Sequence, residues 1–127
     1  MWTAIQDWAR VGEVLRTGGV WNGEQVIPAG WVETMLGASP AYPNYGMMLW
    51  LGSTWEEKRV YDPAVPAFGN HHSEPFAATD VFFLDGLHVQ RVWIVPSKQL
   101  VIVRTGKDDD EWDDSRLPNL VIRGLAE

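Results

Sequence analysis

The 127-residue sequence contains no cysteine, few basic residues and no long hydrophobic run. The absence of cysteine excludes disulfides, thiolate zinc sites and a cysteine nucleophile. The chain has 10 Lys and Arg residues, compared with 17 Asp and Glu residues, and the basic residues form no cluster in the sequence. Nucleic-acid binding is therefore not expected. No apolar stretch approaches the ~20 residues that cross a bilayer, and no signal peptide follows Met1, so no membrane partner is expected. The compartment stays open between periplasm and cytoplasm.

The composition is otherwise typical of a folded soluble domain. Hydrophobic residues make up 46% of the chain and charged residues 21%, which argues against global disorder. The length allows one hydrophobic core, so residues 1–127 are expected to form a single unit. Eight Trp residues indicate extensive aromatic packing or an aromatic-lined cleft.

Apolar residues at helical spacing predict a helix near the start of the chain. Thr3 followed by Gln6 fits a capping box, and Gly18-Gly19 provides a stop. On this helix one face would carry Ile5, Trp8, Ala9, Gly12 and Leu15.

Turn and helix signals alternate through the next part of the chain. Asn22-Gly23 predicts a tight turn, and residues 28–36 predict a second helix with Pro28 in its first turn. Residues 38–44 are expected to form a loop, and residues 45–51 a buried strand. From residue 52 to 79 the signals are weak, and proline prevents any long regular element.

The clearest β signal lies between residues 81 and 104. Residues 81–84, 91–95 and 100–104 are rich in β-branched and aromatic residues, with a turn at Pro96–Gln99. The acidic run Asp108–Asp114 is expected to be a solvated loop that caps a final helix. That helix would bury a stripe made of Leu117, Leu120, Val121 and Leu125.

Together these elements predict an α+β fold. Its antiparallel sheet would contain a three-strand meander plus an additional strand, packed by N-terminal helices and a C-terminal helix.

Several blocks of sequence occur in the order found in one enzyme family. They are Asp7–Arg10, Gly19–Gly23, Ile27–Val32, Tyr45-Gly46 with Leu49-Trp50, and Gly86–Arg104. As a set they resemble the later half of the β-lactamase-related serine hydrolases, which include class C β-lactamases, penicillin-binding proteins and 6-aminohexanoate-oligomer hydrolases. The resemblance implies a C-terminal fragment of a β-lactamase/transpeptidase-like domain. The last branch often carries Gly-x-His-Gly-Gln here, and Val89 replaces its second Gly.

The resemblance implies hydrolysis of small-molecule esters or amides through an acyl-enzyme, with a Ser-x-x-Lys nucleophile. No serine of this chain is followed three places later by lysine, so the chain alone is expected to be inactive. Tyr42-Pro43-Asn44 and Arg104-Thr105-Gly106 match other family motifs only superficially, and we interpret them as a loop and a strand end. The serines and the residues three places later are Ser39 and Tyr42, Ser53 and Glu56, Ser73 and Phe76, Ser97 and Leu100, and Ser115 and Pro118.

The positional equivalent of the family's active-site strand is Leu84-Asp85-Gly86. By resemblance, the backbone N–H of Leu87 is the candidate donor to the oxyanion. His88 either lines the cleft and positions a leaving group, or is a strand histidine bonded to nearby backbone. The resemblance also makes substrate contacts of Gly86, Trp112 and Asp113, although a helix cap is the alternative role for Asp113. Gln90 is a further substrate-binding candidate, because it would alternate to the same side of the strand as His88.

Other interpretations stay open. Adjacent His71 and His72 would point to opposite faces, and the acidic run lacks the spacing of a calcium loop, so no metal or other cofactor is expected. The chain would alternatively be a non-catalytic binding module with an aromatic-rich cleft. A third hypothesis is a truncated reading frame, whose exposed edges would promote self-association.

Overall fold

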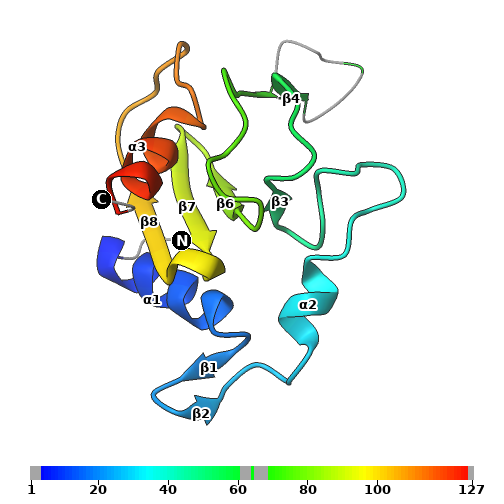
Figure 1. Ribbon diagram of the computed structural model, residues 1–127, viewed down its shortest axis with the longest axis vertical. Helices are drawn as coiled ribbons and strands as arrows, with labels where there is room; N and C mark the ends of the chain where they lie inside the picture. The colour runs from blue at the N-terminus through cyan, green and yellow to red at the C-terminus, as the bar shows by residue number, and fades with distance from the viewer. Residues whose placement is uncertain (1–3, 61–63, 65–68, 126–127) are drawn as a thin grey trace.

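The computed structural model describes residues 4–60, 64 and 69–125, and its elements form an α+β fold (Figure 1). The helices are α1 (Ile5–Arg16), α2 (Trp31–Met35) and α3 (Arg116–Gly124), with a 3₁₀ turn η1 (Pro96–Lys98). The strands are β1 (Val20–Trp21), β2 (Glu24–Gln25), β3 (Trp50–Leu51), β4 (Lys58–Val60), β5 (Gly69–His71), β6 (Phe82–Gly86), β7 (Gln90–Val95) and β8 (Leu100–Arg104). Among the described residues, no helix has the length and apolar character needed to cross a membrane.

The main sheet is antiparallel and has four strands in the order β3-β6-β7-β8. Strands β6, β7 and β8 follow one another as a meander, with Phe83 opposite Trp93 and Trp93 opposite Ile102. Strand β3 adds to β6 through the pair Trp50 and Phe83. The predicted meander, its additional strand and the turn at Pro96–Lys98 are therefore confirmed.

The two faces of this sheet pack against different helices. Phe82, Val92 and Ile94 belong to a core that includes Leu15 of α1. The alternate residues on the same strands pack with Ile122 of α3. Because side chains alternate across a strand, each strand contributes to both cores, and the sheet is covered on both faces (Figure 1).

Helix α1 lies where the sequence predicts it, across β7 and β8. Its N-cap is Ala4, without a side-chain cap, and Thr3 of the predicted capping box lies outside the described residues. Gly18 and Gly19 adopt positive φ and end the helix, with the Gly19 N–H donating to the Val14 carbonyl at 2.7 Å.

The elements between α1 and the meander match the predictions less closely. Asn22 and Gly23 form the predicted turn, both with positive φ, between β1 and β2. The second helix, α2, is shorter than predicted, because Gly30 has a left-handed N-cap conformation and leaves Pro28 outside the helix. Trp31 is 50% exposed, and Val32 is the α2 residue that joins the core.

The predicted strand over residues 45–51 is wrong for most of its length. Only Trp50-Leu51 forms strand β3. The preceding residues form a tight turn in which Met48 has φ +61° and the Gly46 N–H donates to the Leu49 carbonyl at 2.8 Å. Met48 is therefore 77% exposed, whereas the side chain of the next residue, Leu49, is buried.

Residues 52–79, for which the sequence pattern predicts no long regular element, include a short hairpin. Strands β4 and β5 pair antiparallel, with Arg59 opposite Asn70, and both of these residues are buried. Polar side chains at buried positions give no hydrophobic alternation, so the sequence pattern could not reveal this hairpin.

Helix α3 buries only part of the predicted stripe, in which Leu117 packs against the core that contains Ile122. Pro118, Asn119 and Ile122 are buried, whereas Leu120 and Leu125 are 61% and 60% exposed. The Asn119 amide fixes this orientation, because it accepts from the Ala77 N–H at 2.7 Å and donates to the Pro75 carbonyl at 2.9 Å.

Candidate functional site

A cleft of about 1040 Å³ opens where the turn between β6 and β7 meets the loop after α2 and the acidic loop before α3. Tyr42, Tyr45 and Trp50 form an aromatic cluster in its wall, and the Tyr45 and Trp50 rings meet edge to face at 5.0 Å. The lining residues are Ser39, Ala41, Tyr42, Tyr45, Trp50, Asn70, His71, Asp85, Gly86, Leu87, His88, Val89, Arg91, Asp108, Asp109, Asp110, Trp112 and Asp114.

The structure brings part of the predicted site together. Gly86, Leu87, His88 and Trp112 all line the cleft. Gln90 and Asp113 are not among the described residues that line it.

The β6–β7 turn has an unusual backbone for its sequence. His88 and Val89 have φ of +61° and +56°, and the turn closes with Gly86 opposite Gln90. The left-handed region is disfavoured for any side chain and most of all for a β-branched one. Val89 thus occupies a conformation that glycine adopts without cost.

Two side chains hold this turn in place. The Gln90 amide donates to the carbonyls of His88 and Gly106, both at 2.7 Å, and accepts from the Gly106 N–H at 3.1 Å. Arg104 donates to the Val89 carbonyl at 2.6 Å, and its guanidinium lies 4.0 Å from the centre of the Trp112 ring. The hydrogen bonds of the Gln90 side chain therefore connect the turn to the backbone of Gly106.

His88 lies in the turn, so the interpretation as a strand histidine is wrong. Its side chain is 57% exposed, and Nδ1 lies 2.6 Å from a carboxylate oxygen of Asp108. Leu87, which precedes it, is 80% exposed. The expected alternation of His88 and Gln90 along one strand face does not apply, because two residues with positive φ separate the strands.

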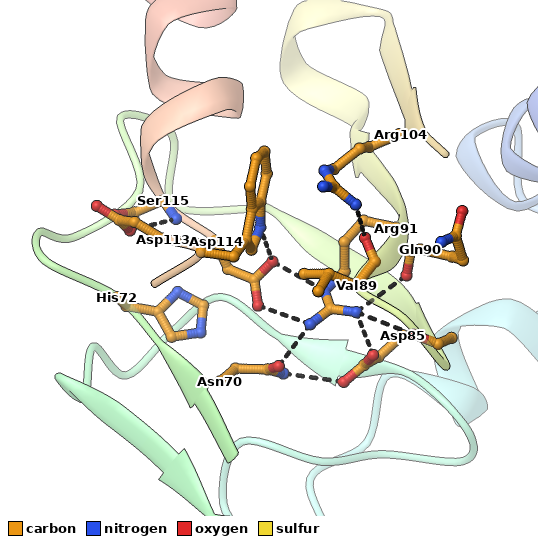
Figure 2. A network of polar contacts seen from close by, with 12 residues as sticks. Asn70, His72, Asp85, Val89, Gln90, Arg91, Arg104, Asp113, Asp114 and Ser115 are labelled. Atoms are coloured by element: carbon orange, nitrogen blue, oxygen red, sulfur yellow. Dashed lines mark hydrogen bonds and ion pairs between the residues drawn. The ribbon is translucent and has the colours of Figure 1, made fainter. Parts of the chain in front are cut away.

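A buried ionic network underlies the cleft (Figure 2). The Arg91 guanidinium is 4% exposed and binds Asp114 through two hydrogen bonds of 2.8 and 3.0 Å. It also pairs with Asp85 and donates to the Asn70 amide oxygen at 2.6 Å. Asn70 in turn donates to Asp85 at 3.0 Å, so β5, β6, β7 and the acidic loop meet at one cation.

Burial raises the pKa of the Asp114 carboxyl, and the neighbouring Arg91 charge opposes that shift. The Trp112 indole N–H donates to the same carboxylate at 2.9 Å. Asp114 thus anchors both the network below it and an aromatic ring of the cleft.

Asp113 points away from this network, toward two serines. Its carboxylate accepts from the N–H and hydroxyl of Ser115 at 2.9 and 2.5 Å, and from the Ser73 hydroxyl. Although burial opposes the shift, these hydrogen bonds lower the pKa of Asp113 to about 2. This geometry, immediately before α3, is that of a residue that organises the helix start.

A second buried cation lies beside this region. The Arg59 Nη1 atom donates to Nε2 of His72 at 2.8 Å, and both side chains are almost fully buried. Burial and, second, the Arg59 charge lower the pKa of His72 to about 3, so this histidine is neutral. His71 is exposed and lines the cleft, as expected for neighbouring residues on an extended strand.

The two motifs that match family motifs only superficially lie in a loop and at a strand end. Tyr42-Pro43-Asn44 lies in the loop after α2, where Asn44 donates to the Thr54 carbonyl at 2.6 Å, yet Tyr42 lines the cleft. Arg104 ends β8. Among residues 4–60, 64 and 69–125, no group of three His, Asp or Glu side chains is placed to hold a metal ion.

Sequence reasoning missed the buried network, and it predicted an aromatic-lined cleft without identifying the residues of the aromatic cluster. Arg91 lies in a mostly apolar strand. This position was a signal for the buried network, because a charged residue at a buried strand position needs a partner. Nothing in the sequence identifies that partner. A scan of the chain against models of protein families found no match, and a search of curated proteins found none either.

Proposed function

We propose that this chain is the C-terminal part of a serine hydrolase of ester or amide bonds, related to the β-lactamases and penicillin-binding proteins. The nucleophilic Ser-x-x-Lys would come from outside these 127 residues. One observation supports this above the others: β6 ends at Gly86, and Gly86 and Leu87 both line the cleft. The four-stranded antiparallel sheet between α1 and α3 is compatible with part of a β-lactamase-like domain.

In the proposed reaction, the serine hydroxyl passes its proton to the lysine of the Ser-x-x-Lys pair and attacks the substrate carbonyl, so that negative charge develops on the carbonyl oxygen. The bond to the protonated alcohol or amine leaving group then breaks, and water hydrolyses the resulting acyl-enzyme. The Leu87 N–H donates a hydrogen bond to the negatively charged carbonyl oxygen. A donor of this kind needs a rigid backbone, which the Gln90 contacts to His88 and Gly106 supply. An oxyanion-hole donor is worth about 2.7–4 kcal/mol in the transition state.

His88 is proposed to position the leaving group. In the neutral tautomer whose Nδ1–H donates to Asp108, Nε2 is a hydrogen-bond acceptor. The exposed side chain leaves this nitrogen accessible to a bound molecule.

The aromatic cluster favours a second candidate, a binding module without chemistry. Tyr42, Tyr45 and Trp50 offer apolar faces with polar edges, as do many ligand pockets. Saturable quenching of tryptophan fluorescence without turnover would favour this function.

The first test is covalent labelling with a fluorophosphonate probe. The purified 127-residue chain is expected to show no labelled serine. Labelling of Ser39, Ser53, Ser73, Ser97 or Ser115 would contradict the proposal.

The second test uses the gene product read from the genomic sequence, including the region before the Met1 codon. There the probe is expected to label a serine that precedes a lysine by three residues. Leu87→Pro removes the N–H and is expected to lower kcat by about 10²–10³-fold, whereas Leu87→Ala keeps the N–H and most activity. Equal activity of these variants would refute the oxyanion role.

A further inference from the structure

The described residues that line the cleft carry unbalanced charge. Five aspartates line it, and Arg91 is the single Lys or Arg among these lining residues. Asp85 and Asp114 lie beside Arg91, whereas Asp108, Asp109 and Asp110 form an exposed rim. The wall and rim together therefore create a negative potential in the cleft.

Arg91 is poorly placed to bind an anionic ligand. Its guanidinium is 4% exposed and binds Asp114, Asn70 and Asp85, with further bonds to backbone carbonyls. Recruiting it would break a buried ion pair. Arg104 is similarly engaged, because it binds the Val89 carbonyl and stacks on Trp112.

The aromatic wall points to the same ligand chemistry by a separate route. Ring faces carry a negative quadrupole potential that attracts ammonium and guanidinium groups. Tyr42, Tyr45 and Trp50 are gathered on one side of the cleft, with the ring centres of both tyrosines within 6.4 Å of that of Trp50. An aromatic wall beside carboxylates suits a cation with an apolar body.

We propose that this cleft selects ligands that carry an ammonium or guanidinium group and rejects those that carry a carboxylate or sulfonate. The inference rests on the proposed function, whose substrate class it names: cationic esters or amides. The cationic group is attracted both by the carboxylates of Asp108, Asp109 and Asp110 and by the ring faces of the aromatic wall, which also contacts the apolar part of the ligand. Anionic substrates are disfavoured because they would face these carboxylates, while Arg91, the one Lys or Arg among the described lining residues, is buried in its ion pairs.

The test is a fluorescence titration of the 127-residue chain with two matched probes, benzyltrimethylammonium and phenylmethanesulfonate. The ammonium is expected to bind saturably and at least about tenfold more tightly, and added salt is expected to weaken it. Equal or tighter binding of the sulfonate, or no binding of the ammonium, would overturn the inference.

Two charge-matched variants separate the cleft from the overall charge of the molecule. Asp108→Asn, Asp109→Asn and Asp110→Asn combined are expected to weaken ammonium binding about fivefold or more and to reduce its salt dependence. Glu24→Gln, Glu33→Gln and Glu57→Gln combined change the net charge equally at exposed positions outside the cleft, and should leave binding unchanged. Equal weakening in both variants would overturn the inference.

These outcomes are distinct from those that test the hydrolase. Binding of the two charged probes does not require the nucleophilic serine. If the ammonium binds selectively but the gene product is not labelled, the charge preference still holds and the binding module is favoured over the hydrolase. Successful labelling together with tighter sulfonate binding would retain the hydrolase and remove the charge preference.

Discussion

Val89 carries a backbone conformation that its side chain disfavours. Its φ is +56°, in a turn where His88 also has positive φ. A left-handed conformation costs an L-residue roughly 1–2 kcal/mol, and glycine avoids this cost. The strain persists because the Val89 carbonyl is held by Arg104 and the turn by Gln90.

Val89→Gly is therefore expected to stabilise the chain. The strain energy that is relieved exceeds the entropic cost of the more flexible unfolded chain, so the free energy of unfolding is expected to rise by about 0.5–1 kcal/mol. The measurement is the free energy of unfolding in urea. Leu87→Gly, at a neighbouring position without positive φ, is the control and should bring no gain. A loss of stability in Val89→Gly would show that the turn is not strained.

The same turn shows how far a residue can be interpreted from sequence. The family resemblance assigns Gly86, Leu87 and His88 to a candidate site, and all three line the cleft. The role of Gln90 was not accessible, because its amide binds Gly106, which lies 16 residues away.

At the scale of elements, α1 approaches the sheet closely at Gly12. A Cβ at this position would lie 2.5 Å from a Val101 methyl and 3.0 Å from a Val92 methyl. Both valines are stiff β-branched residues in adjacent strands, so neither can move cheaply. Gly12 thus permits the contact of α1 with β7 and β8.

Gly12→Ala is expected to lower the melting temperature despite the higher helix propensity of alanine. Overpacking costs about 1–3 kcal/mol, against a propensity gain of about 1 kcal/mol. The matched control is Gly124→Ala in α3, where a Cβ would meet open space and stability should rise by up to about 1 kcal/mol. A gain in both variants would contradict this packing.

Helix α3 illustrates why the buried face of an element was predicted only in part. Its leucines suggested an apolar stripe, but Asn119 is buried and Leu120 is exposed. The deciding contact is between Asn119 and the backbone of Pro75 and Ala77, more than 40 residues earlier. Helical periodicity alone carries no information on such a partner.

For the whole molecule, Arg91 connects segments that are distant in the sequence. It binds β5 through Asn70, β6 through Asp85 and the acidic loop through Asp114 (Figure 2). The network therefore positions one side of the cleft relative to the sheet.

Arg91→Met is expected to destabilise the chain by about 3–5 kcal/mol, because two buried carboxylates lose their cation. Urea denaturation measures this loss. Arg116→Met, at an exposed position on α3, is the control and should change stability by less than about 0.5 kcal/mol. A small effect of Arg91→Met would mean that the network contributes little to holding the cleft.

The sequence by itself determined the elements that depend on a few neighbouring residues. Strands β6–β8 follow from runs rich in aromatic and β-branched residues, the end of α1 from Gly18-Gly19, and the first hairpin from Asn22-Gly23. Only the tertiary structure decided which polar groups are buried together, such as Arg91 with Asp114 and Arg59 with His72. Buried polar groups need partners that chain folding brings from afar, and no local pattern records those partners.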